Sequence, residues 1–195
     1  MIRIAHRRNT IEELRLTPKE LGIEIDIRSE GASLIVVHDP FQPGIDFDEW
    51  FAHFDHKTLI LNVKEEGLED ALLKRMATRD VTDFFFLDQS FPFLLKTARA
   101  GERRCAVRVS EYESIETALS LTGLIDWIWV DVFTRFALTG REAARLKAAG
   151  FRLCLVSPEL QGRWDEREID DIKATCIREG IELDAVCTKR PQCWP

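Results

Sequence analysis

The sequence has no excess of positive charge and no long apolar run. Its 195 residues include 27 Lys and Arg against 34 Asp and Glu, a formal net charge of −7. A nucleic-acid surface or an anionic membrane would favour a basic face, and no stretch approaches the roughly 18 apolar residues of a membrane span. The sequence therefore predicts neither a nucleic-acid partner nor a membrane span.

Closely spaced cysteine pairs are also missing. The five cysteines form no CxxC motif and are odd in number, and Cys105, Cys154 and Cys187 lie inside apolar runs. We interpret these three as reduced, buried thiols, which favours a reducing compartment. The first residues also lack the apolar segment of a secretory signal. We therefore expect a cytoplasmic protein.

Linkers, repeats and low-complexity stretches are absent as well. The apolar fraction of 45% and the charged fraction of 31% are typical of a globular protein, and the chain is long enough for one sizeable core. We expect one domain spanning residues 1–195. The sequence leaves the oligomeric state open.

What the chain does contain is a regular alternation of short apolar runs with amphipathic stretches, the pattern of βα units. The predicted strands are Ile2–Ala5, Ile23–Ile27, Leu59–Val63, Phe84–Leu87, Cys105–Val109, Trp127–Val130, Leu153–Val156 and Ala185–Thr188. The predicted helices are Ile11–Leu21, Leu68–Ala77, Pro92–Ala100, Ile115–Leu121, Arg141–Ala149 and Glu166–Glu179. Glycines at 22, 101, 150 and 180 stand where helices of this kind end. Eight strands predict a small (β/α)8 TIM barrel, with an open doubly wound sheet as the alternative.

One segment interrupts the alternation. The run that begins at Ile23 is followed by the turn Ser29–Ser33 and a second β-rich run from Leu34 to His38. Two such runs joined by a short glycine-containing link predict a β-hairpin. The hairpin would bring His38 back beside the end of the second strand, and Pro40–Asp48 would follow as a loop.

Two carboxylates in the second strand are the first candidates for chemistry. Glu24 and Asp26 alternate with isoleucines, so both point to one face of the strand. Inside a barrel, two acids must be paired or must bind a cation, because an unpaired buried charge is too costly. A strand with one solvated face is the structural alternative.

Two histidines stand at the ends of β-runs beside that strand. His6 follows the first strand and His38 ends the predicted hairpin. With an unperturbed pKa of about 6.5, one imidazole can serve as base and the other as acid at neutral pH, as phosphodiester cleavage requires. The planar guanidinium of Arg7 suits a phosphate oxygen.

Later strands supply further candidates. Asn62 and Lys64 share one face of the third strand, and Lys64 either holds a phosphate oxygen or pairs with Glu24 or Asp26. Arg108 lies in a later strand and completes the site, or else forms an ion pair with Asp131.

The order and spacing of these residues resemble the glycerophosphodiester phosphodiesterase family, within the superfamily of phospholipase C-like phosphodiesterases. His6-Arg7 resembles the His-Arg-Gly of the family, Asn9-Thr10 the end of its Glu-Asn-Thr, Glu24-Ile-Asp26 its Glu-x-Asp, and His38-Asp39 its His-Asp. Further along the chain, Asn62-Val-Lys64 resembles Glu-Ile-Lys, Ser90-Phe91 resembles Ser-Phe, and the segment from Thr188 to Pro191 resembles Thr-Asp-x-Pro.

The resemblance implies a TIM barrel and a metal-dependent phosphodiesterase acting on a small diester of the glycerol-, polyol- or sugar-phosphate type. It implies His6 and His38 as the acid/base pair and Arg7 as a phosphate ligand. Lys64 and Arg108 are further phosphate-binding candidates because of their places in the strands. Glu24, Asp26 and Asn62 would form the site of a divalent cation, Mg²⁺ or Ca²⁺, since such hard ions prefer oxygen ligands.

The chain departs from the family pattern in ways that affect the metal and the substrate. Asn62 stands for a carboxylate, Arg8 for a glycine and Lys189 for an aspartate, and the segment between His-Arg and Asn-Thr is cut away. The long insertion that binds glycerol in the family is reduced to residues 40–59, which favours a sugar or polyol diester. Two alternatives remain: a metal-independent lyase in which Lys64 or Arg108 replaces the cation, and a non-catalytic barrel that binds a phosphorylated ligand or a partner.

Overall fold

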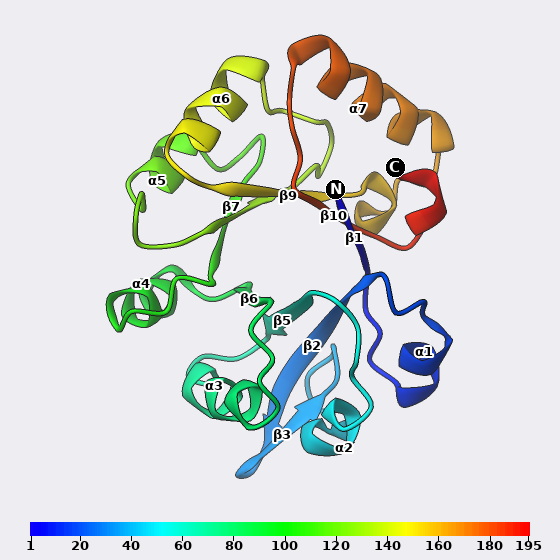
Figure 1. Ribbon diagram of the computed structural model, residues 1–195, viewed down its shortest axis with the longest axis vertical. Coiled ribbons are helices and arrows are strands. Elements are labelled where there is room, and N and C mark those ends of the chain that lie inside the picture. The colour runs from blue at the N-terminus through cyan, green and yellow to red at the C-terminus, as the bar shows by residue number, and fades with distance from the viewer.

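A curled parallel sheet surrounded by helices forms the framework of the protein (Figure 1). The computed structural model describes the backbone of residues 1–195 and every side chain except that of residue 166. The parallel strands are β1 (Ile2–Ala5), β2 (Gly22–Glu30), β5 (Leu59–Val63), β6 (Phe84–Leu87), β7 (Ala106–Val109), β8 (Trp127–Val130), β9 (Arg152–Val156) and β10 (Ala185–Thr188). The expected α/β, TIM-barrel-like architecture is confirmed.

The strand order places the first strand between the second and the last. Parallel ladders run from β6 through β5, β2, β1, β10, β9 and β8 to β7. The two ends of this path, β6 and β7, meet at one isolated bridge between Phe86 and Cys105. We call this junction the β6–β7 seam. All the parallel strands direct their carboxyl ends to the same edge of the sheet, where active sites of TIM barrels lie.

Strand β2 extends beyond its parallel neighbours and pairs antiparallel with β3 (Ser33–Val36), from Ile27 opposite Val36 to Glu30 opposite Ser33. The segment 40–48 was predicted to be a loop, and this is wrong at its end. Residues Ile45–Asp46 form the short strand β4, and Phe47 begins helix α2 (Phe47–Phe51). The side chain of Asp46 caps α2 by accepting from the Glu49 N–H at 3.0 Å, a local signal that outweighs the nearby prolines.

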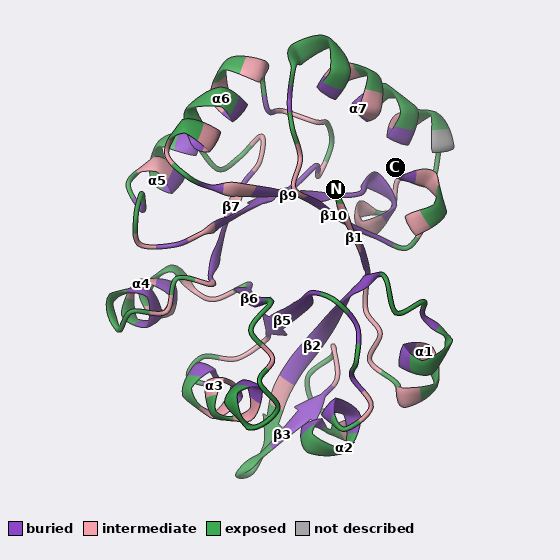
Figure 2. Ribbon diagram, in the orientation of Figure 1, coloured by how far each residue is buried: buried purple, intermediate pink, exposed green. Residues whose placement is uncertain are grey.

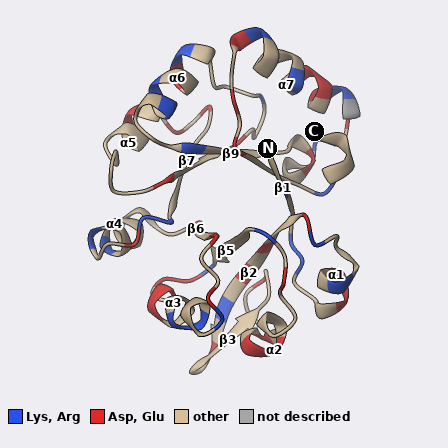
Figure 3. Ribbon diagram, in the orientation of Figure 1, with Lys and Arg blue, Asp and Glu red and all other residues tan. Residues whose placement is uncertain are grey.

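The other helices are α1 (Ile11–Leu16), α3 (Glu69–Thr78), α4 (Phe91–Arg99), α5 (Ile115–Leu119), α6 (Gly140–Ala148) and α7 (Glu166–Glu179), with 3-10 turns η1 (Pro158–Gln161) and η2 (Pro191–Cys193). All of them except α1 lie within two residues of their predicted bounds. Lys, Arg, Asp and Glu all occur on α3 and α7 (Figure 3). Within the described chain, no helix combines the length and apolarity needed to cross a membrane.

Helix α1 ends earlier than predicted, and Gly22 does not terminate it. The helix stops at Leu16, and Gly22 is the first residue of β2. A side chain at position 22 would lie 2.9 Å from the Ile4 side chain and 3.0 Å from the Thr58 carbonyl oxygen. Glycine is required here by close packing between strands.

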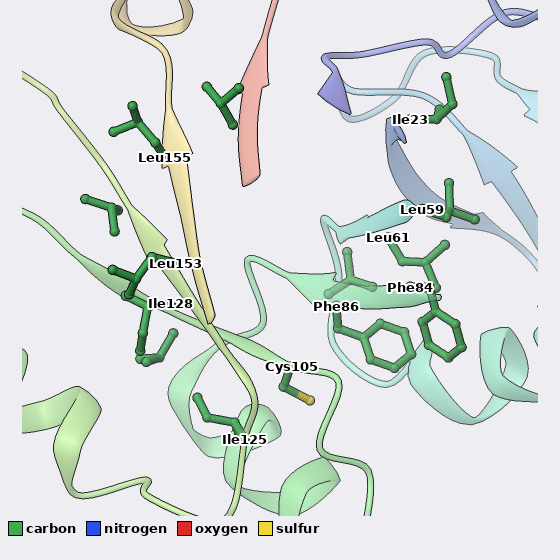
Figure 4. Packing of buried hydrophobic residues seen from close by; sticks show 14 of the residues in the cluster. Ile23, Leu59, Leu61, Phe84, Phe86, Cys105, Ile125, Ile128, Leu153 and Leu155 are labelled. Atoms are coloured by element: carbon green, nitrogen blue, oxygen red, sulfur yellow. The ribbon is translucent and has the colours of Figure 1, made fainter. Parts of the chain in front are cut away.

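Two apolar clusters sit on the two sides of the sheet. The outer cluster fills the layer between strands and helices. The helices bury the faces that they turn toward the sheet and expose the opposite faces (Figure 2). Phe84, Phe86 and Cys105 belong to its part beside the seam (Figure 4). The inner cluster includes Ile4, Phe85 and Trp127 and fills the space enclosed by the strands. This inner filling leaves the carboxyl ends of the strands as the place for polar side chains.

Replacing Phe85 by alanine should destabilise the protein strongly. Its buried ring stacks on Trp127 with centroids 4.4 Å apart, and truncating a buried Phe costs about 3–5 kcal/mol. Urea unfolding should show this loss in Phe85→Ala, whereas Phe41→Ala, at a fully exposed position, should unfold like the wild type. Equal midpoints for the two variants would contradict the packed inner cluster.

Candidate active site

The acid pair of β2 lies inside the curled sheet. Glu24 and Asp26 are completely buried, and so are Ile23, Ile25 and Ile27, which belong to the outer cluster. The alternation seen in the sequence therefore separates an acidic inner face from an apolar outer face, and the solvated-strand alternative is wrong.

Glu24 accepts hydrogen bonds at both of its oxygens. The Asn62 Nδ2 donates to Oε1 at 2.9 Å, and the backbone N–H of Arg7 donates to Oε2 at 2.7 Å. The latter contact follows from the local backbone, because Arg7 has a φ of 52° in the left-handed region that non-glycine residues seldom adopt. Burial and the neighbouring Asp26 carboxylate raise the pKa of Glu24.

Asp26 lies among two cations and an amide. The Asn9 Nδ2 donates to its Oδ2 at 2.9 Å, while the Asp26 N–H donates to Asn9 Oδ1 at 3.0 Å. Arg7 Nε lies 3.3 Å from Oδ2, and Lys64 Nζ lies 3.2 Å from Oδ1. Two positive charges therefore compensate the buried carboxylate, as burial of a charge requires. Of the two roles predicted for Lys64, the structure shows the pairing with Asp26.

His6 faces the same pair. Its Nε2 lies 3.7 Å from Glu24 Oε2, and its buried Nδ1 has no hydrogen-bond partner. Burial is the main cause that lowers the pKa of His6 to about 3, followed by the positive charge of Arg7. The imidazole is thus neutral at physiological pH.

His38 is near the end of β2 through its backbone but turns its side chain elsewhere. The preceding Val37 N–H donates to the Asp26 carbonyl at 3.0 Å. The His38 side chain is 39% exposed and its Nδ1 lies 2.7 Å from Asp39 Oδ1. Among the described residues, no hydrogen bond or ion pair joins His38 to His6 or to the acid pair. The two histidines therefore belong to one end of the sheet, His6 within it and His38 on its rim.

A chain of alternating charges continues from Lys64 across the carboxyl ends of β6, β7 and β8. Lys64 Nζ lies 3.3 Å from Asp88 Oδ2, Asp88 pairs with Arg108, and Arg108 lies 3.5 Å from Asp131 Oδ2. Burial raises the pKa of Asp131, although Gln161 donates to it at 2.7 Å. The predicted Arg108–Asp131 ion pair is present, and it forms part of the larger network.

Asn9, Asp88 and Glu159 were not predicted as site residues, although Asn9 belongs to one of the motifs that resemble the family. Asn9 clamps Asp26, Asp88 links Lys64 to Arg108, and the buried Glu159 accepts from the Lys189 N–H at 2.9 Å and from Thr188. Asp88 directly follows β6, and Glu159 follows β9 by three residues. Searching every strand's carboxyl end for carboxylates would have found both.

The donor set does not fit a divalent cation in this arrangement. Asn62 uses its Nδ2 on Glu24, and only two buried oxygens of the predicted ligand set, Asp26 Oδ1 and Asn62 Oδ1, lack a hydrogen-bond donor. The Lys64 ammonium lies 3.2 Å from the first of them. Glu65, a possible replacement ligand, instead accepts from the Ser29 hydroxyl at 2.6 Å. The described residues also contain no group of three His, Cys, Asp or Glu side chains placed to hold a metal.

Solved structures of other proteins share the fold of this chain. A glycerophosphodiester phosphodiesterase from Agrobacterium tumefaciens matches with a TM-score of 0.68 over 99% of each chain, at 17% sequence identity. The chain has the fold of this enzyme. A second glycerophosphoryl diester phosphodiesterase, from Parabacteroides distasonis, matches with a TM-score of 0.66 over 98% of this chain and 84% of the other, at 12% identity.

No protein-family model and no curated protein matches the sequence. The glycerophosphodiester phosphodiesterase fold is thus found through structure, in agreement with the motif-level resemblance.

The His6–Glu24 pair should make two variants respond oppositely to pH. The ordinary pKa of His is 6.5, and the folded protein lowers the pKa of His6 to about 3. Below pH 6.5 the unfolded chain therefore binds a proton at His6 that the folded protein does not bind. As the pH decreases, this difference makes the folded state less stable. Glu24 has a raised folded pKa and binds a proton more tightly when folded, so its contribution rises as pH falls. In the wild type the two effects oppose each other between pH 6.5 and 5.

Urea unfolding at pH 7, 6 and 5 in EDTA would test this. Relative to the wild type, His6→Gln should gain stability as pH falls and Glu24→Gln should lose it, each by at most about 1.4 kcal/mol per pH unit. His53→Gln serves as the control at a histidine outside the site. Parallel pH profiles for all four proteins would contradict the opposed titration.

Proposed function

We propose that this protein is a phosphodiesterase of the glycerophosphodiester phosphodiesterase type, acting on a small phosphodiester. The observation that carries the proposal is the buried Glu24–Asp26 pair, surrounded by His6, Arg7 and Lys64 at the carboxyl ends of the strands. The fold shared with solved phosphodiesterases supports the same conclusion.

The proposed reaction begins inside the substrate. His6 takes the proton of a substrate hydroxyl that neighbours the phosphate, and that oxygen attacks phosphorus. The bond to the leaving alcohol breaks, and the alcohol oxygen receives a proton from His38. Water then opens the cyclic phosphate to give a monoester. A neutral His6 fits the role of base, and the hydrogen bond to Asp39 orients His38 on the rim.

The phosphate oxygens would be bound by Arg7, Lys64 and Arg108. Each side chain is held by carboxylates of the site, so it is oriented before substrate arrives. Charge that develops on the phosphoryl oxygens would be stabilised by these fixed cations.

A specific observation favours a metal-independent form of this reaction. The divalent cation implied by the resemblance, Mg²⁺ or Ca²⁺, would use Glu24, Asp26 and Asn62. Lys64 is already paired with Asp26, and Asn62 contributes its amide NH₂ to Glu24. We therefore infer that the Lys64 ammonium supplies the electrostatic role of the cation.

We further interpret the curled sheet as a complete (β/α)8 barrel with a hairpin after its second strand, forming a single domain. The five free cysteines support the expected cytoplasmic location.

Replacing His6 by alanine should reduce cleavage of a 2-hydroxyalkyl p-nitrophenyl phosphate by about 100-fold or more, the usual loss when a general base is removed. Release of p-nitrophenolate at neutral pH measures the rate. His53→Ala is the matched control, since this histidine contacts Arg15 and lies outside the site. If His6→Ala cleaves as fast as the control, His6 is not the base.

The role of Lys64 should be visible without metal. We expect cleavage by EDTA-treated protein to persist and to fall sharply in Lys64→Met, whereas Lys74→Met, on the exposed side of α3, should behave like the wild type. Cleavage that disappears in EDTA and returns with Mg²⁺ or Ca²⁺ would instead establish the metal-dependent form. Phosphate-ester binding with no cleavage under any condition would indicate a non-catalytic barrel.

A further inference from the structure

A further cation, Lys189, stands directly after the carboxyl end of β10. Side chains along a strand alternate between its two faces. In β10, Ala185 and Cys187 belong to the inner cluster, whereas Val186 belongs to the outer one. Lys189 comes two residues after Cys187 and continues the inner series. The candidate site residues of β1, β5 and β7 continue the inner series of their own strands in the same way.

The neighbour of this position across the sheet is His6. Strands β1 and β10 are parallel partners with Ala5 opposite Thr188, so His6 and Lys189 leave the ladder side by side. The His6 N–H still donates to the Thr188 carbonyl at 3.0 Å. After burial and the charge of Arg7, the charge of Lys189 also lowers the pKa of His6. Lys189 therefore flanks His6 from the side of β1 that is turned away from β2 (Figure 1).

A buried carboxylate fixes the backbone at this point. Glu159 accepts from the Lys189 N–H at 2.9 Å and from the Thr188 hydroxyl at one oxygen, and from the Ser157 hydroxyl at the other. These donors satisfy the buried carboxylate and attach the end of β10 to the end of β9. The base of the Lys189 side chain is thus held in place, as a preorganised binding group requires.

The ring of Trp164 lies beside the ammonium group of Lys189. The distance from Lys189 Nζ to the centre of this ring is 5.3 Å, and Trp164 is 52% exposed. A cation over an indole is attracted by the π electrons of the ring. The ring therefore restrains the ammonium group without neutralising its charge.

Lack of a carboxylate partner distinguishes Lys189 from the other cations of the site. Arg7, Lys64 and Arg108 each lie within ion-pair distance of a carboxylate. No ion pair among the described side chains includes Lys189. A phosphodiester anion would meet three cations whose charge is already compensated and one whose charge is not. The uncompensated charge attracts the anion most strongly.

We propose that Lys189 binds a phosphoryl oxygen of the substrate on the β10 side of His6. The inference rests on the proposed phosphodiesterase function and adds to it a residue that departs from the resembled family pattern, which has an aspartate at this place. The phosphoryl group is then bound from the β5 side by Lys64 and from the β10 side by Lys189.

Replacing Lys189 should change cleavage according to the charge at this position. Lys189→Met should lower kcat/KM for the 2-hydroxyalkyl p-nitrophenyl phosphate by about tenfold or more, the effect of losing one charged hydrogen bond. Lys189→Asp should lower it further, whereas Lys189→Arg, which keeps the charge, should retain most of it. Lys57→Met is the matched control, because Lys57 is an exposed lysine at the amino end of β5.

Calorimetry with methyl p-nitrophenyl phosphate measures binding alone. This diester has no hydroxyl next to the phosphate, so the proposed reaction does not cleave it. Its Kd should rise about tenfold or more in Lys189→Met and stay unchanged in Lys57→Met.

The outcomes separate this inference from the proposed function. Wild-type cleavage with equal kcat/KM and Kd in Lys189→Met and Lys57→Met would overturn the role of Lys189 while the phosphodiesterase function stands. An equal loss in Lys189→Arg and Lys189→Met would also overturn it, because the arginine keeps the charge. The same order of variants in calorimetry, without cleavage of any diester, would support the phosphate site without the reaction. Absence of both binding and cleavage in the wild type would overturn both.

Discussion

Burial of two carboxylates on the inner face of β2 is the constraint on which the rest of the site depends. Glu24 and Asp26 have no contact with water, so neighbouring elements must supply donors and positive charge. Strands β1 and β5 flank β2 on its two sides. Arg7 and Asn9 follow β1 and Lys64 follows β5, so these side chains reach the acids. The choice of neighbours in the sheet thus determines which cations reach the acids.

The same constraint accounts for the two cations beside Asp26. Arg7 and Lys64 reach this carboxylate from two different strands, and Glu24 is bound by the Arg7 N–H and the Asn62 amide. Asn62 lowers the negative charge that needs compensation and gives its NH₂ group to Glu24. The site is therefore close to electrically balanced by its own side chains.

Much of the framework was predictable from local pattern. The bounds of β1, β5, β6, β8 and β10 agree with the sequence, because strands buried on both faces are short, apolar and bounded by polar residues. The predicted end of α1 was wrong because the apolar periodicity runs on to Leu21. The helix stops at Leu16, since Thr17 precedes Pro18 and adopts an extended backbone (φ −82°, ψ 131°).

The candidate site likewise contains features that local sequence pattern predicted and features that it did not. Alternation along β2 predicted the shared face of Glu24 and Asp26, because side-chain direction in a strand is a local property. The predicted approach of His38 to the end of β2 holds for its backbone alone, because its side chain pairs with the adjacent Asp39. The position of Asp88 directly after β6 was visible in the sequence, but its role was not, because the contacts of Asp88 with Lys64 and Arg108 depend on the order of strands in the sheet.

The seam, with its single backbone bridge, marks the boundary between two halves of the sheet. Residues before the seam form one half of the sheet, β1 to β6, and residues after it form the other, β7 to β10, each continuous in sequence. The halves are joined by a four-residue ladder between β1 and β10 and by the lone bridge between Phe86 and Cys105. Separating the sheet at the seam would therefore break one backbone bridge, whereas separating it at β1 and β10 would break a ladder of four residue pairs. The line between β6 and β7 is thus where the strands enclosing the inner cluster hold to each other least.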